Sequence, residues 1–193
     1  MPAPLHVTFA GGATGPWRVD RLEAVRGEGL PLVERLSVIE GRDMAPPQGA
    51  VWVLRGVTSN ERYVTRAEHD ALADRQPPLD RPDTTRAALI PVRKTDRWWD
   101  LSQNERRAIF EERSGHVGIG LEYLPAVARR LLHGRDLGEP FDFLTWFLYA
   151  PTDAKAFEEL VARRRETEEW SYVEHEIDIR LAWDADRPRR LPS

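Results

Sequence analysis

Two residues near the middle of the chain carry side chains suited to chemistry. His116 offers a nitrogen that can bind a metal, and Arg129 is a cation at any working pH. Both lie in an apolar, helix-forming stretch bounded by glycines, and an aromatic strand follows. Glu169, further along the chain, offers a carboxylate that can hydrogen-bond to an imidazole. Imidazole, guanidinium, aromatic wall and carboxylate are together the parts of a haem pocket that accepts a small anion.

The separation of these two residues limits how they can meet. On a straight helix, the 13 residues from His116 to Arg129 would span about 20 Å. They serve one site only if the chain bends between them, and Gly118, Gly120 and Pro125 are candidate bends. Each residue also has an ordinary explanation: a hydrogen-bonded histidine at a helix start, and an arginine on a solvated helix face. Residue types and spacing leave these interpretations open.

The stretch after Gly115 is predicted to be helical as far as His133. Its apolar residues recur at helical spacing, namely Ile119, Leu121, Leu124, Val127 and Leu131. His133-Gly134 suits the end of this helix, because an imidazole there meets the negative end of the helix dipole and glycine adopts a left-handed conformation easily. His133 is therefore interpreted as a helix terminus rather than a ligand. Ser102 and Glu105 form a capping box that predicts a helix just before it.

This helical segment joins two β-α-β halves. In the first half, a strand from Val51 runs into a turn at Ser59-Asn60. A capping box of Thr65 and Glu68 then predicts a short helix, which prolines end, and residues 87–92 form the returning strand. The Gly- and Pro-rich first 50 residues give no clear pattern.

The second half begins with a strand over residues 141–149. Its alternation places one set of side chains on one face, namely Phe141, Phe143, Thr145, Phe147 and Tyr149. Apolar spacing around Phe157 predicts a helix, and residues 173–181 alternate as a strand with one solvated face.

Composition narrows the classes of function. The chain has 193 residues, enough for one domain or one domain of two similar halves. Its net charge of −4 argues against a nucleic-acid partner, and no apolar run is long enough to cross a bilayer. The chain has no cysteine and no evident signal peptide, so we expect a cytoplasmic protein.

From about Trp98 to Leu181 the chain resembles the chlorite dismutase family of haem proteins, and its length is similar to that of the family's short, dimeric branch. The matching stretches are Trp98-Trp99-Asp100-Leu101, Glu105-Arg106, His116, Tyr123-Leu124, Arg129, Leu132-His133 and Asp142-Phe143-Leu144-Thr145. The resemblance implies two ferredoxin-like β-α-β modules, an α+β fold with a barrel-like core and helices outside. It also implies haem b in the C-terminal module and a homodimer. We expect a partly degenerate N-terminal half over 1–95, a haem-binding half over 96–184 and a tail over 185–193.

The resemblance also assigns residues. Anchored on the Tyr-Leu and Leu-His pairs, it places the axial iron ligand on His116 and the distal arginine on Arg129. Thr145 and Phe147 take the positions of the distal pocket, although both also suit an inward-facing strand core. The carboxylate that bonds to the axial imidazole falls on Glu169.

Three of these assignments have close competitors. Glu166 and Glu168 are neighbouring candidates for the carboxylate, and Glu169 also suits an exposed helix end. Trp98, with Trp99, is expected at the porphyrin edge, yet adjacent tryptophans also anchor cores and interfaces. Lys94 is a candidate for the hydrogen-bond network of Glu169, against the ordinary expectation of a surface lysine.

The activity implied is the haem-dependent decomposition of chlorite to chloride and dioxygen, with formation of an O–O bond. His116 and Glu169 would make the iron a stronger electron donor, and Arg129 would hold the anion near it. Related proteins decarboxylate coproporphyrin haem and lack the distal arginine, so Arg129 argues against that activity. A haem sensor or carrier, a peroxidase-like protein and a ferredoxin-like protein without haem stay open as alternatives.

Overall fold

The computed structural model describes residues 4–42, 45–58, 63–79 and 81–184. Its strands are β1 (His6–Gly12), β2 (Trp17–Arg26), β3 (Arg35–Glu40), β4 (Trp52–Val57), β5 (Arg86–Lys94), β6 (Val127–His133), β7 (Phe143–Tyr149) and β8 (Val173–Trp183). Its helices are α1 (Arg66–Arg75), α2 (Asp96–Asp100), α3 (Gln103–Arg107), the π-helical η1 (Ala108–Arg113), α4 (His116–Glu122) and α5 (Ala154–Arg165). Short 3-10 turns are η2 (Arg135–Leu137), η3 (Pro151–Asp153) and η4 (Glu168–Tyr172).

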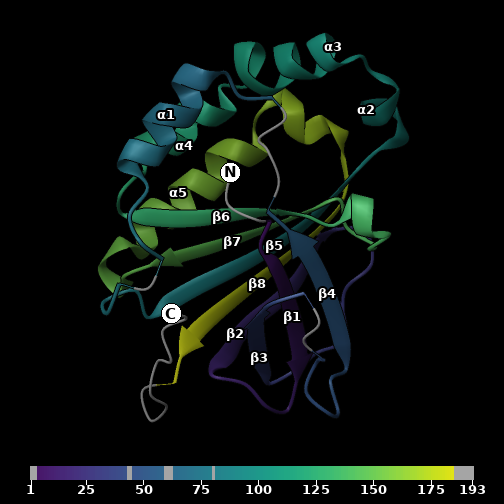
Figure 1. Cartoon of the computed structure of the whole chain (residues 1–193), viewed down its shortest axis with the longest axis vertical. Coiled ribbons are helices and arrows are strands. Elements are labelled where there is room, and N and C mark those ends of the chain that lie inside the picture. Colours follow the sequence, from purple (N-terminus) through teal and green to yellow (C-terminus); the bar gives the residue numbers. More distant parts are fainter. Residues whose placement is uncertain (1–3, 43–44, 59–62, 80, 185–193) are drawn as a thin grey trace.

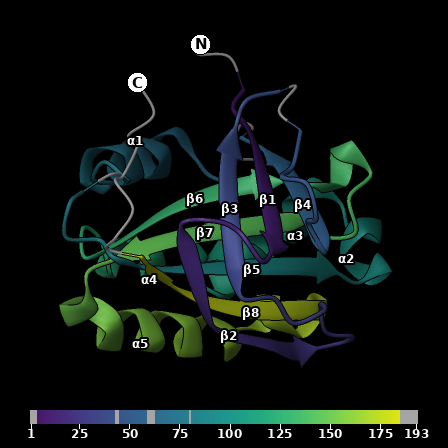
Figure 2. The ribbon, with the colours of Figure 1, turned by 90° about the horizontal axis from the view of Figure 1, so that it is seen from below.

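The strands close into an antiparallel barrel in the order β1-β3-β2-β8-β5-β7-β6-β4. The barrel consists of two four-stranded sheets with equivalent order, β4-β1-β3-β2 and β8-β5-β7-β6. In Figure 2, β1 and β3 lie in front of β5, β6 and β7, so the two sheets face one another. The predicted α+β fold with a barrel-like core is confirmed.

Two apolar layers surround the second sheet. Its inner face packs in the barrel interior against β1, β3 and β4, with Phe9, Leu36, Leu89, Leu144 and Ile179 fully or almost fully buried. Its outer face packs under α5, through residues that include Ile90, Phe147, Phe157 and Leu160. Figure 1 shows α1, α4 and α5 together on this outer side. Among the described residues, no helix lies between the strands of the first sheet.

Local sequence signals place several helices correctly. Thr65 accepts from the backbone N–H of Glu68 and the Glu68 carboxylate accepts from that of Thr65, which confirms this capping box at the start of α1. The box of Ser102 and Glu105 opens α3 in the same way. The strands predicted over 87–92 and from Val51 are β5 and β4.

The predicted helix from Gly115 to His133 is wrong beyond Glu122. The helix α4 ends there, the chain turns through residues 123–126, and residues 127–133 form β6. Arg129 is therefore on a strand rather than a helix face. His133 is a buried strand residue and not a helix terminus. The strand forms because β6 pairs with β7 along its whole length, a long-range interaction that outweighs helical spacing.

Two details of the other predicted strands also differ. Phe141 precedes β7 and packs in the barrel interior, so it does not share the face of Phe143 and Phe147. The face of β8 predicted to be solvated is mostly buried, and its charged groups form ion pairs with side chains of α5 and β2. Among them, Arg165 binds Glu176 and Asp178.

The strand pairing favours a division of the chain between β4 and β5, because β5 pairs with β7 and β8. The predicted boundary at residue 95 stays a prediction. The predicted turn at Ser59-Asn60 and the tail over 185–193 lie outside the described residues. None of the described helices is long and apolar enough to cross a membrane.

Candidate functional site

A cavity lies between the outer face of the second sheet and the helices α1, α4 and α5. It encloses about 1100 Å³, including the space at its open mouth. Its walls are mostly apolar, and all the site residues predicted from the sequence line it, namely Lys94, Trp98, His116, Arg129, Thr145, Phe147 and Glu169. These seven residues come from three strands and three helical segments, which meet at one place.

His116 is the first residue of α4. Gly115 precedes it with a φ of 60°, a left-handed conformation that turns the chain into the helix. The ring of Phe110 stacks on the imidazole at 4.2 Å between centroids. The carboxylate of Glu111 accepts from the backbone N–H groups of Val117 and Gly118, which fixes the start of the helix.

The imidazole is hydrogen-bonded to a buried carboxylate. His116 Nδ1 lies 2.6 Å from Glu169 Oε2. An ionised carboxylate only accepts, so Nδ1 carries the proton and Nε2 keeps its lone pair. The neighbouring candidates do not take this place, because Glu166 ends α5 at the surface and Glu168 is exposed and pairs with Arg113.

Lys94 holds the other oxygen of this carboxylate. Its Nζ lies 2.8 Å from Glu169 Oε1, and Ser114 Oγ accepts from the backbone N–H of Glu169. The ammonium group also lies 4.7 Å from the ring centroid of Trp98 and 5.5 Å from that of Trp170. Lys94, Glu169 and His116 thus form one hydrogen-bonded chain that ends at the cavity.

The electrostatics of this chain favour a neutral imidazole. Burial lowers the pKa of His116 to about 4, and the charge of Arg164 adds to this effect while Glu169 opposes it. Burial alone would raise the pKa of Glu169, but the charge of Lys94 and the bond to His116 hold that pKa well below its usual range. At neutral pH the site therefore holds a neutral imidazole beside a carboxylate anion.

Arg129 approaches from the opposite wall. It is paired with Phe147 across β6 and β7, and Leu131 is paired with Thr145, so these side chains share the cavity face of the sheet. The guanidinium reaches across to α4, where a Cβ built on Gly120 would lie 2.0 Å from Arg129 Nη1. Glycine at position 120 thus allows this close approach.

One residue at the centre of the site is not predicted from the sequence. Arg164, on α5, is 6% exposed, and its Nη1 lies 2.5 Å from His116 Nε2. Burial and the nearby charge of Arg129 lower the pKa of Arg164 to about 9. Its place in the run Arg163-Arg164-Arg165 suggests a solvated helix face. The available signal was its position, one turn after Leu160 and Val161 on the apolar side of α5.

The two tryptophans play different parts. Trp98 is 1% exposed and lines the cavity, and its Nε1 is buried without a hydrogen-bond partner among the described residues. Trp99 stacks on Phe143 and lies under the guanidinium of Arg135. His133 also lines the cavity, on the same face of β6 as Arg129.

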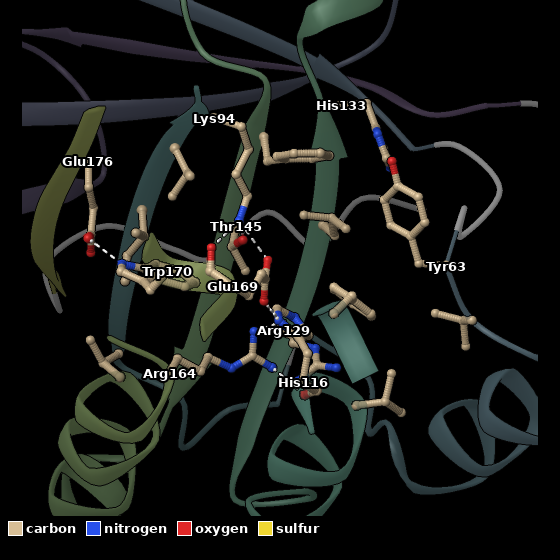
Figure 3. A pocket seen from close by; sticks show the side chains of 18 of the residues that line it. Tyr63, Lys94, His116, Arg129, His133, Thr145, Arg164, Glu169, Trp170 and Glu176 are labelled. Atoms are coloured by element: carbon tan, nitrogen blue, oxygen red, sulfur yellow. Dashed lines mark hydrogen bonds and ion pairs between the residues drawn. The ribbon is translucent and has the colours of Figure 1, made fainter. Parts of the chain in front are cut away.

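The site residues fit a haem. Haem iron needs a protein ligand on one side, and His116 Nε2 is a lone-pair donor that faces a largely apolar cavity. A carboxylate on the other ring nitrogen is the usual partner of a metal-bound histidine. The guanidinium groups that project into the cavity belong to Arg129 and Arg164, whose long side chains can move aside (Figure 3).

Comparison with known proteins gives a consistent result. A family model described as chlorite dismutase matches residues 39–182. The chain is 52% identical to dimeric chlorite dismutases from Nitrobacter winogradskyi, with a TM-score of 0.85 over 92% of this chain and 99% of that chain. A chlorite dismutase from Candidatus Nitrospira defluvii in complex with imidazole is 18% identical, with a TM-score of 0.62 over 92% and 91% of the two chains, a likeness that supports the fold alone.

Proposed function

The chain belongs to the chlorite dismutase family, and from this membership and the geometry of the cavity we propose that it decomposes chlorite to chloride and dioxygen with a haem b held by His116. The observation that carries the proposal is the buried chain from Lys94 through Glu169 to His116, which leaves one imidazole nitrogen facing the cavity. A carboxylate on one ring nitrogen is the usual partner of a histidine that binds a metal through the other nitrogen.

Bound haem would supply the iron that accepts an oxygen atom from chlorite. The protein's part on the proximal side is to orient the imidazole and increase its electron donation. Glu169 does this by accepting the Nδ1 proton in a strong hydrogen bond, and Lys94 keeps Glu169 ionised and in place. A more electron-rich ligand favours cleavage of the bond between chlorine and oxygen.

Arg129 is the proposed catalytic residue. Chlorite and the chlorine oxyanion that forms from it are both anions, and the second must stay in the cavity until the O–O bond forms. A guanidinium stays cationic at the working pH and offers several donors, so it can hold both anions. Thr145 and Phe147 narrow the cavity beside it and exclude water, which strengthens this attraction.

The same geometry weighs on the alternatives. Arg129, a cation on the wall opposite His116, suits a small anionic substrate. It argues against a coproporphyrin haem decarboxylase, because the related proteins with that activity lack the distal arginine. A haem sensor or carrier would use the same His116 and Glu169. It has no need of an arginine aimed at the iron-binding side, so the enzyme is favoured.

Three further points belong to this proposal. We propose a homodimer, supported by the similarity to dimeric chlorite dismutases. Haem b rather than a c-type haem is proposed because the chain has no cysteine for covalent attachment. A cytoplasmic location stays a prediction from the sequence.

The first experiment is to load the chain with haem, add chlorite and follow dissolved oxygen with an electrode. We expect prompt oxygen in a one-to-one ratio to the chlorite consumed. Bound haem without oxygen would instead favour a sensor or a peroxidase-like protein. Loss of porphyrin mass on addition of peroxide to coproporphyrin haem would favour the decarboxylase.

A further inference from the structure

Arg164 is a buried cation with no described carboxylate in contact with its guanidinium, and Glu169 and Glu111 act on its charge only from a greater distance. Its guanidinium forms no ion pair with an Asp or Glu among the described residues, and its Nε is buried without a hydrogen-bond partner there. The residues on either side differ: Arg163 pairs with Glu122, and Arg165 pairs with Glu176. A buried cation with no carboxylate in contact is costly, so the missing contact calls for an explanation.

The hydrogen bonds of the Arg164 side chain to other described residues both go to His116. Nη1 lies 2.5 Å from the imidazole Nε2, and Nη2 donates to the backbone carbonyl of His116 at 3.3 Å. The proposed function assigns Nε2 to the haem iron, and the inference rests on that assignment. A single lone pair cannot bind iron and accept from Arg164 together. Haem binding therefore removes the shorter of these hydrogen bonds.

The displaced guanidinium needs an anion that the nearby protein does not offer. Both oxygens of Glu169 are already engaged, one by His116 and one by Lys94. Both oxygens of Glu111, the other carboxylate that acts on Arg164, accept from backbone N–H groups at the start of α4. Arg129, the other arginine that lines the cavity, has the same charge as Arg164 (Figure 3). The incoming haem itself carries carboxylates, and a guanidinium binds a carboxylate through two parallel hydrogen bonds.

We propose that Arg164 binds a carboxylate of the haem once the iron has taken its place on His116. Arg164 enters the cavity from α5, one turn after the cavity residue Val161. Its long side chain can thus leave Nε2 and stay in the cavity without any shift of the helix. The haem-free protein keeps the guanidinium on His116, and the loaded protein transfers it to the ligand.

The test compares haem with its dimethyl ester, in which both carboxylates are blocked. Each ferric porphyrin is titrated into the haem-free chain, and binding is followed by the Soret band and by quenching of tryptophan fluorescence. The proteins are the wild type, Arg164→Gln, Arg164→Lys and the matched control Arg163→Gln. This control removes a neighbouring charge that pairs with Glu122 outside the cavity. The design is a double-mutant cycle between one side chain and one ligand group.

We expect the wild type and Arg163→Gln to prefer haem over the ester by about tenfold or more, as for a hydrogen-bonded charge pair. Arg164→Gln should lose most of this preference, and Arg164→Lys should recover part of it. The proposal is overturned if Arg164→Gln keeps the preference of the wild type. It is also overturned if that variant changes the affinity for both porphyrins equally. That result is expected of a residue that only supports the fold, or that only competes with the iron for His116 Nε2. A wild type that binds neither porphyrin would instead contradict the proposed function.

Discussion

Lys94 Nζ lies 2.8 Å from Glu169 Oε1, and the two side chains are only 3% and 6% exposed. A buried ion pair of this kind leaves a costly unpaired charge when one partner is removed. We therefore expect Glu169→Gln to lower the free energy of unfolding of the haem-free chain by about 3 kcal/mol. Chemical denaturation measures this change.

The control for this prediction is Glu168→Gln, one residue earlier. Glu168 pairs with Arg113 at the surface, where such pairs contribute less than about 1 kcal/mol. Equal effects of the two substitutions would show that the buried pair does not contribute in the way described.

Replacing His116 should remove the proposed iron ligand. We expect His116→Ala to bind haem weakly or not at all, with loss of the Soret band that loaded wild-type protein shows. His133→Gln is the matched control, because His133 is the other histidine that lines the cavity. A normal Soret band in His116→Ala together with its loss in His133→Gln would show that His133, and not His116, binds the iron.

Replacing Arg129 should spare haem binding and impair turnover. We expect Arg129→Ala to lose about 100-fold or more in oxygen production and to bleach faster, because the chlorine oxyanion escapes and attacks the haem. Arg130→Ala is the control, since Arg130 pairs with Glu40 and does not line the cavity. Full activity and durability of Arg129→Ala would contradict the proposed role.

Acid should weaken the contact between α1 and α3. Glu68 accepts from Arg107 through both carboxylate oxygens, and this hydrogen bonding lowers the pKa of Glu68 to about 2. Its pKa is lower in the folded than in the unfolded chain. The stabilisation is therefore complete above the ordinary value of 4.5 and is lost as the pH falls towards 2.

The size of this acid effect is modest, about 1 kcal/mol, because solvent screens a partly exposed pair. Glu68→Gln should lower the stability at pH 7 by this amount and flatten the fall in stability between pH 4.5 and 2. Denaturation at several pH values measures both. An unchanged acid profile in the variant would contradict the assignment.

Features that depend on neighbouring residues along the chain could be predicted well from the sequence. The capping boxes of Thr65 and Ser102 satisfy backbone groups within one turn, so their signal is local, and both helices begin where expected. The cavity face of β7 follows from strict alternation for the same reason. The site residues themselves came from the family resemblance, and the structure brings them to one cavity.

The sequence failed where distant partners decide the structure. Val127 and Leu131 fit helical spacing from α4, but alternate residues of 127–133 also fit a strand, and pairing with β7 decides between the two. Arg164 was missed because a run of three arginines suggests solvent, whereas only the packing of α5 against the cavity shows which of the three is buried.

The barrel is not held equally firmly all the way round. On one side β6 is paired with β7 from Val127 to His133, but on the other side the described residues of β4 and β6 pair only at Val57 and His133. Local opening in proteins begins where backbone hydrogen bonds are fewest. We therefore expect amide hydrogens along this seam to exchange earliest in the barrel. The strand β6, which carries Arg129, is thus hydrogen-bonded along its length on one side and at few positions on the other. We expect this wall of the cavity to move locally without unfolding of the rest of the sheet.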